Sequence, residues 1–135
     1  MRDARDRIDE LVAAAREMRA RAYAPYSEFH VGAAVLAGDR VFGGANIENA
    51  SYPLSVCAER NAVAAAVLAG QRSIDVVAVV ADGDTPTPPC GGCRQVLNEF
   101  GPQMLVVCES QSGERAQWTL PEILPHAFGP SNLGK

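Results

Sequence analysis

Cys57-Ala58-Glu59-Arg60 is the segment around which this 135-residue sequence is organised, together with its counterpart Pro89-Cys90-Gly91-Gly92-Cys93-Arg94-Gln95. Each segment opens a stretch of residues that favour helix, so the cysteines fall at helix starts. The positive end of a helix dipole and its free backbone N–H groups stabilise a thiolate there. Two such helix starts, placed side by side, would form a face of three sulfurs, and zinc binds thiolates. We therefore interpret the rest of the chain as the scaffold and pocket of a zinc centre.

The spacing of apolar residues around these segments predicts an α/β fold. Helices are expected over residues 5–22, 57–69, 91–100 and from residue 120, and strands over residues 31–37, 41–45, 74–81, 104–108 and 116–120. A turn through Gly38-Asp39-Arg40 makes the first two strands a hairpin, and Thr119 with Glu122 forms a capping box. Strands that alternate with helices after a hairpin imply a mixed five-stranded sheet with helices on both faces, a three-layer α/β/α arrangement.

The composition of two stretches predicts how they pack. Gly32, Ala33 and Ala34 are small enough to let a helix lie close against the sheet. Residues 62–69 are apolar on every side, and a helix without a polar face must be buried all round. A domain of this size has little interior, so we expect part of this helix to pack against another subunit.

Length and composition fit one catalytic domain that covers residues 1–135. A net charge of −4 gives no general attraction to nucleic acid. The apolar runs are too short to span a bilayer, and no apolar signal segment follows the charged first residues. We expect a cytoplasmic protein without nucleic-acid or membrane partners, whose four cysteines are thiolates or metal ligands rather than disulfides.

The pair Cys90 and Cys93 taken alone fits several kinds of site, and Cys57 is needed to choose between them. Cys90-x-x-Cys93 alone fits a redox pair, half of a structural zinc site, or chance. Cys57 supplies a third thiolate, and three ligands with an open fourth position are typical of catalytic zinc. Cys108 falls within a strand of buried type, so we interpret it as a small core residue.

Three charged residues beside the cysteines have candidate roles. Glu59 follows Cys57 by two residues, an offset that disfavours ligation but would place a proton carrier beside the open position. The alternative is that Glu59 only compensates the helix dipole. Arg60 is our candidate donor to the zinc-bound sulfurs. Arg94 is a second candidate, or else a solvent-facing helix residue.

These segments, with others along the chain, resemble the short homotetrameric, zinc-dependent type of the cytidine deaminase family. The resemblance extends to Ala24-Pro25-Tyr26-Ser27, Phe29 with Val31-Gly32-Ala33-Ala34, Asn46-Ile47-Glu48-Asn49-Ala50-Ser51-Tyr52, and the tail from Leu124-Pro125 to Phe128. It implies the family fold and one Zn²⁺ per chain, held by Cys57, Cys90 and Cys93. Pro53 and His30 differ from the residues common at these positions in the family, but neither difference affects the predicted zinc ligands.

The resemblance also implies a reaction, the deamination of free cytidine and deoxycytidine to uridine and deoxyuridine in pyrimidine salvage. Zinc would supply a hydroxide for attack at C4, and Glu59 would carry protons to N3 and the leaving amine. Further roles are implied for substrate-binding residues: Phe29 against the base, Ala58 on the base through its backbone, Asn46 and Glu48 on the ribose, and Phe128 in a neighbouring subunit's pocket.

Other classes of protein share parts of this pattern of residues. A histidine as first ligand would suggest nucleic-acid-editing or tRNA deaminases, which Cys57 and the acidic charge disfavour. A blasticidin-type deaminase shares the zinc signature, but the segment from Asn46 to Tyr52 favours cytidine. A redox protein would use Cys90 and Cys93 without metal. A structural zinc module would give no reason for Glu59.

Overall fold

The computed structural model describes residues 4–135 and builds them around one five-stranded sheet of order β2-β1-β3-β4-β5. The strands are β1 (Val31–Ala37), β2 (Arg40–Ala45), β3 (Val76–Ala81), β4 (Leu105–Ser110) and β5 (Arg115–Thr119). β3 and β4 are parallel, whereas the other neighbouring pairs are antiparallel. The predicted mixed sheet is therefore confirmed.

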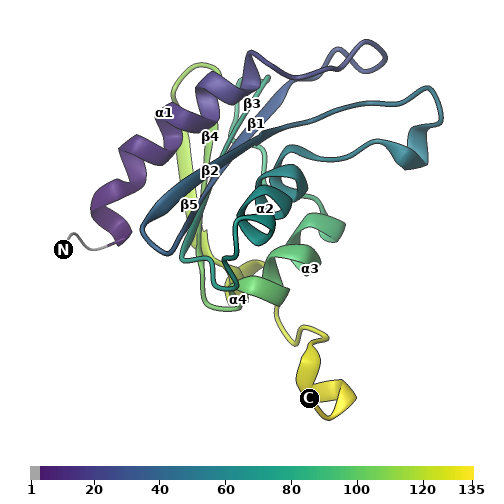
Figure 1. Cartoon of the computed structure of the whole chain (residues 1–135). Coiled ribbons are helices and arrows are strands. Elements are labelled where there is room, and N and C mark those ends of the chain that lie inside the picture. Colours follow the sequence, from purple (N-terminus) through teal and green to yellow (C-terminus); the bar gives the residue numbers. More distant parts are fainter. Residues whose placement is uncertain (1–3) are drawn as a thin grey trace.

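Helices cover both faces of this sheet (Figure 1). They are α1 (Ile8–Arg19), α2 (Ala58–Leu68), α3 (Gly91–Phe100) and α4 (Leu120–Ile123), with 3-10 turns at Ala4–Arg7, Tyr52–Leu54 and Pro130–Leu133. α1 packs on one face and α2 with α3 on the other, which confirms the three-layer prediction. Within residues 4–135, no helix has the length and apolar character needed to cross a membrane.

Each face of the hairpin carries a glycine that brings a helix backbone close. A Cβ on Gly32 would lie 2.0 Å from the carbonyl oxygen of Ala15 in α1. A Cβ on Gly44 would lie 2.4 Å from the backbone nitrogen of Ala62 in α2. Since side chains at these positions would push the helices away, α1 and α2 can approach the sheet only over glycine. The expectation that small residues allow close packing is confirmed, and Gly44 extends it to the helix that follows Cys57.

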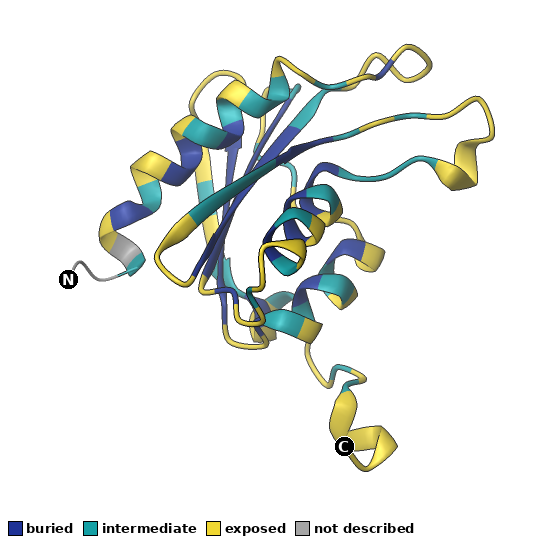
Figure 2. Ribbon diagram, in the orientation of Figure 1, coloured by how far each residue is buried: buried dark blue, intermediate teal, exposed yellow. Residues whose placement is uncertain are grey.

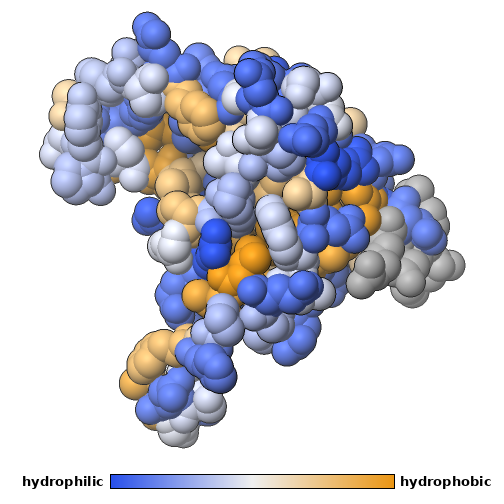
Figure 3. Space-filling model, turned by 180° about the vertical axis from the view of Figure 1, so that it is seen from behind, coloured by the Kyte–Doolittle hydropathy of each residue, from blue (hydrophilic) through white to orange (hydrophobic). Residues whose placement is uncertain are grey.

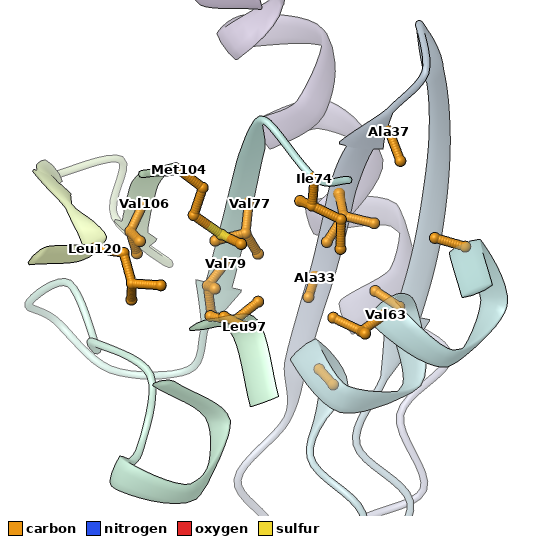
Figure 4. Close-up of a cluster of buried hydrophobic side chains, with 14 of the residues drawn as sticks. Ala33, Ala37, Val63, Ile74, Val77, Val79, Leu97, Met104, Val106 and Leu120 are labelled. Carbon is orange, nitrogen blue, oxygen red and sulfur yellow. The ribbon is translucent and has the colours of Figure 1, made fainter. Parts of the chain in front are cut away.

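Two apolar layers separate the sheet from its helices. Figure 4 shows the layer under α2 and α3, where Val63 and Leu97 meet Ala33 and Val79 of the sheet. The second layer joins Leu11, Val12 and Ala15 of α1 to the opposite face. β3 and β4 are buried along their whole length, as Figure 2 shows, which explains their nearly continuous runs of apolar residues.

Two loops extend together beyond the sheet, beside the start of α2 (Figure 1). Residues 20–30 and 46–57 are joined where the Tyr23 N–H donates to the Asn46 carbonyl at 3.0 Å. The Glu48 N–H donates in turn to the Tyr23 carbonyl at 2.8 Å. Much of both loops is exposed in the single chain, as is the tail after α4 (Figure 2).

Substitution of Gly44 by alanine tests the close approach of α2. The added methyl has no space beside Ala62, so we expect Gly44→Ala to lower the free energy of unfolding by about 1–3 kcal/mol, as overpacking does. Gly92→Ala is the control, because a Cβ there has no neighbour within 4 Å. Urea unfolding of both variants measures the difference. Equal stability of Gly44→Ala and the parent protein would contradict this packing.

Candidate metal centre and active site

The three predicted ligands meet where α2 and α3 begin. Cys57 is the N-cap residue of α2, Cys90 is the N-cap residue of α3, and Cys93 lies in the first turn of α3. The Sγ atoms of Cys57 and Cys90 are 3.9 Å apart, and those of Cys90 and Cys93 are 3.3 Å apart. All three lie within 4.8 Å of one another. Tetrahedral zinc with Zn–S bonds of about 2.3 Å separates its sulfurs by about 3.8 Å, so these residues fit the ion.

The electrostatics of the sulfurs also call for a cation. Hydrogen bonds from the thiols of Cys93 and Cys90, together with the nearby charge of Arg60, lower the pKa of Cys57 to about 6. The pKa of Cys93 is raised, because its thiol donates to the Cys57 sulfur and is buried. The thiol of Cys57 therefore loses its proton easily, whereas that of Cys93 keeps its proton. A dication supplies the charge that three adjacent thiolates require.

Glu59 lies in the first turn of α2 and is only 5% exposed. Burial raises the pKa of its carboxyl group to about 7, and the negative charge of Cys57 adds to this effect. Its oxygens do not belong to the cluster of potential ligands that the three sulfurs form among the described residues. A carboxyl group in this position can take up and release a proton near neutral pH.

A cavity of about 290 Å³ opens beside the sulfurs and Glu59. Its wall consists of Ser27, Phe29, Val31, Asn46, Glu48, Cys57, Ala58, Glu59, Val79, Thr87, Pro88 and Cys90. Four residues predicted to bind substrate are therefore brought together here with two ligands, namely Phe29, Asn46, Glu48 and Ala58. A cavity of this size, whose wall combines apolar side chains with polar and ionisable ones, suits a small molecule.

Asn46 is fixed at the cavity by its own amide group. Its Oδ1 accepts from the Val31 N–H at 2.9 Å, and its Nδ2 donates to the Phe29 carbonyl at 2.8 Å. From α2, the Asn61 Nδ2 donates to the Ala45 carbonyl at 2.8 Å, immediately before Asn46. The end of β2 is therefore tied both to the Phe29 loop and to the metal-ligand helix.

Ser27 is a cavity residue for which sequence analysis predicted no separate role. The Glu48 carboxylate accepts from the Tyr26 N–H at 2.9 Å, the Ser27 N–H at 3.1 Å and the Ser27 hydroxyl. The hydroxyl contact contributes most to lowering the pKa of Glu48. The Ser27 Oγ also accepts from the Phe29 N–H at 3.0 Å, so one hydroxyl links two predicted substrate-binding residues. Its place just before Phe29 was the available signal, because serine hydroxyls commonly bond backbone two residues on.

Phe128 lies apart from its own chain's cavity, on the tail, and is 58% exposed. Its carbonyl accepts from the Gln95 Nε2 at 2.9 Å and from the Asn98 Nδ2 at 3.4 Å. α3 therefore holds the backbone at Phe128 and leaves its ring available for contacts outside the chain.

Arg60 and Arg94 differ in their surroundings. Arg60 is exposed, and among the contacts of residues 4–135 its effect on the site is its charge beside Cys57. Arg94 does not face solvent, so that interpretation is wrong, and its hydrogen bonds go to backbone carbonyls. Its Nε donates to the Pro89 carbonyl at 2.8 Å and its Nη1 to the Ile123 carbonyl at 2.7 Å. Cys108 is fully buried in β4, as predicted for a core residue.

Comparison with known proteins agrees with this geometry. The model of the family "Cytidine and deoxycytidylate deaminase zinc-binding region" matches residues 5–109. A cytidine deaminase of Sporosarcina psychrophila is 44% identical over 128 residues, covering 93% of this chain and 94% of that protein. One of Halalkalibacterium halodurans is 48% identical over 125 residues, covering 91% and 95%.

Solved structures show the same fold. The crystal structure of cytidine deaminase from Burkholderia pseudomallei aligns with a TM-score of 0.86 at 45% identity, over 89% of this chain and 98% of that one. That of Mycobacterium tuberculosis aligns with a TM-score of 0.76 at 38% identity, over 90% and 96%. With its three-cysteine zinc site and its α/β/α fold, this chain belongs to the cytidine deaminase family.

Proposed function

We propose that the protein hydrolyses free cytidine and deoxycytidine to uridine and deoxyuridine, with release of ammonia, as a step of pyrimidine salvage. The observation that carries this proposal is the cavity in which three sulfurs within 4.8 Å of one another adjoin the buried carboxyl group of Glu59. The relatives named cytidine deaminases support it over nearly their whole length. A redox pair would give no reason for Glu59, and neither would a structural zinc module.

Cys57, Cys90 and Cys93 are the residues that hold Zn²⁺. Zn²⁺ held by these residues would supply the chemistry that makes water a nucleophile at neutral pH, by lowering its pKa. Arg60 offsets part of the negative charge of the three thiolates, since its guanidinium already acts on Cys57.

Glu59 is the proton carrier of this site. Attack at C4 of a cytosine requires a proton to leave the water, one to reach N3, and one to reach the departing amine. Two carboxylates line the cavity, and Glu48 is occupied by the backbone and hydroxyl of residues 26–27. Glu59 accepts no hydrogen bond from another residue in the part of the chain that the structure describes. Its carboxyl group is therefore the one free to exchange protons with substrate.

The remaining wall suits a nucleoside. Phe29, 37% exposed at the cavity, presents an aromatic ring to the base, and Ala58 presents backbone at the start of α2. Asn46 and Glu48 offer the polar atoms for ribose hydroxyls. A carboxylate has about four acceptor positions, so Glu48 can accept from ribose while retaining part of its contact with residues 26–27. Its negative charge would repel a phosphate group, which favours a free nucleoside over a nucleotide.

A homotetramer completes the proposal. α2 leaves Ala64 and Leu68 uncovered, and Leu68 is 88% exposed. Figure 3 shows further hydrophobic residues gathered between the projecting loops and the rest of the molecule. Such a surface is typical of a subunit interface. Phe128, exposed on the tail, would then enter a neighbouring subunit's pocket. The three ligand thiols need reducing conditions, so we place the enzyme in the cytoplasm.

Replacing Glu59 tests the proton-carrier role. Glu59→Gln keeps the shape but cannot exchange the proton, so we expect kcat for cytidine to fall about 100- to 10,000-fold with one zinc per chain retained. The loss of cytidine's ultraviolet absorbance measures the rate, and metal analysis measures the zinc. Glu48→Gln is the matched control and should mainly raise KM. Full activity in zinc-loaded Glu59→Gln would exclude this role.

A charge on α2 tests the interface. We expect light scattering to give four times the 14.3-kDa chain mass for the parent protein and a smaller mass for Leu68→Glu, because a carboxylate would be buried at the contact. Ala13→Glu, on the exposed side of α1, is the control and should remain tetrameric. A parent protein with the mass of one chain would refute the tetramer.

Complementation tests whether Phe128 completes a neighbour's site. Phe128→Ala should lower activity, whereas Leu133→Ala, also exposed on the tail, should not. Co-expressed Phe128→Ala and Glu59→Gln chains should form sites that combine an intact Glu59 with a neighbour's Phe128. We therefore expect more activity than the two homo-oligomers give together. A rate equal to their mean would show that Phe128 acts only within its own chain.

A further inference from the structure

We propose that Arg94 is a positioning residue that fixes the zinc ligand Cys90 by holding the backbone just before it. The proposal rests on the proposed zinc site and adds to it a residue that touches neither metal nor substrate. The half-buried guanidinium donates from Nε to the Pro89 carbonyl at 2.8 Å. Pro89 directly precedes Cys90, and it is among the most deeply buried side chains of the protein.

Between the buried side chains of Pro89 and Cys93, the start of α3 has no side chain other than that of the ligand Cys90. Gly91 and Gly92 follow Cys90 and are exposed, and a Cβ at either position would meet nothing within 4 Å. Glycine leaves the backbone freer than any other residue, and here no side-chain packing compensates. Two of the three zinc ligands nevertheless lie in this turn. A restraint on the Pro89 carbonyl therefore bears directly on where the Cys90 sulfur lies relative to Cys57.

The second bond of Arg94 anchors this restraint to the core. Its Nη1 donates to the Ile123 carbonyl at the end of α4. α4 is itself fixed, because Leu120 is fully buried and its N–H donates to the Met104 carbonyl at 2.9 Å. Glu122 also accepts from the Thr119 N–H and hydroxyl at the start of α4. Arg94 thus connects the start of α3 to α4, which is anchored in the core through Leu120.

Only arginine suits this task among the basic residues. The planar guanidinium donates from Nε and Nη in different fixed directions, which lets one side chain bond two separate carbonyls. A lysine ammonium carries its three donors on one nitrogen, so it could bond both carbonyls only if they lay within reach of that single atom. The two arginines of the site therefore differ in role. Arg60 acts on Cys57 through its charge, whereas Arg94 hydrogen-bonds a backbone carbonyl.

Zinc transfer to a chromogenic chelator tests the proposal on the holoenzyme. We expect Arg94→Gln to release zinc about 10- to 100-fold faster than the parent protein, the usual effect of losing a group that orients a ligand. Arg94→Lys should lie in between. Arg72→Gln is a matched control, because the Arg72 Nη1 also donates to two backbone carbonyls, those of Val67 in α2 at 2.9 Å and of Gln71 at 2.8 Å. It should release zinc at the parent rate.

Cobalt substitution gives a second readout that general destabilisation would not produce. The visible spectrum of Co²⁺ bound by thiolates reports ligand geometry, and it should change in Arg94→Lys while that of Arg72→Gln stays the same. If Arg94→Gln does not fold, Arg94→Lys alone decides. Parent-like zinc release and cobalt spectrum in the folded Arg94 variants would overturn the proposal, as would equally fast release from Arg72→Gln. Since neither readout uses catalysis, a zinc protein without deaminase activity would sink the proposed function and leave this inference standing.

Discussion

Three sulfurs within 4.8 Å of one another cannot all be thiolates without a cation between them, and the structure is arranged around this constraint. The metal-free group loses one proton readily, since the pKa of Cys57 is lowered to about 6, and then resists further ionisation at Cys93. Helix starts ease the charge from one side, because Cys57 and Cys90 occupy the N-cap positions of α2 and α3, at the positive ends of the helix dipoles. A bound dication would neutralise the rest of the negative charge on the sulfurs. Metal binding and local structure are therefore coupled.

The sheet makes this meeting of helices possible through small residues. Gly44 admits the backbone of α2, and Ala58 and Ala62 are fully buried where α2 lies against the sheet. The same helix carries Glu59 in its first turn, where the side chain is buried. The position of α2 on the sheet thus sets where both the metal ligand Cys57 and the carboxyl group of Glu59 lie.

Much of the fold and of the site could be predicted from the sequence. Alternating apolar runs gave the strands, the spacing of Leu11, Val12 and Ala15 gave α1, and cysteines at helix starts gave the metal centre. These features are local, so a single sequence displays them. The contacts that the sequence could not show join distant positions through backbone atoms. Arg94 donates to the carbonyl of Ile123, and Glu48 accepts from the N–H groups of residues 26–27. A backbone carbonyl or N–H group carries no mark of its partner in the sequence. Such partners become visible only once the fold places them together.

Catalysis at a three-thiolate zinc centre is the central claim, and a zinc titration of metal-free protein tests it most directly. Cytidine deamination should be absent without metal and rise linearly with added Zn²⁺, with a break at one ion per chain. Replacement of any of Cys57, Cys90 or Cys93 by serine should abolish that break. Deamination by the metal-free protein, or a zinc stoichiometry that does not depend on these three cysteines, would contradict the account.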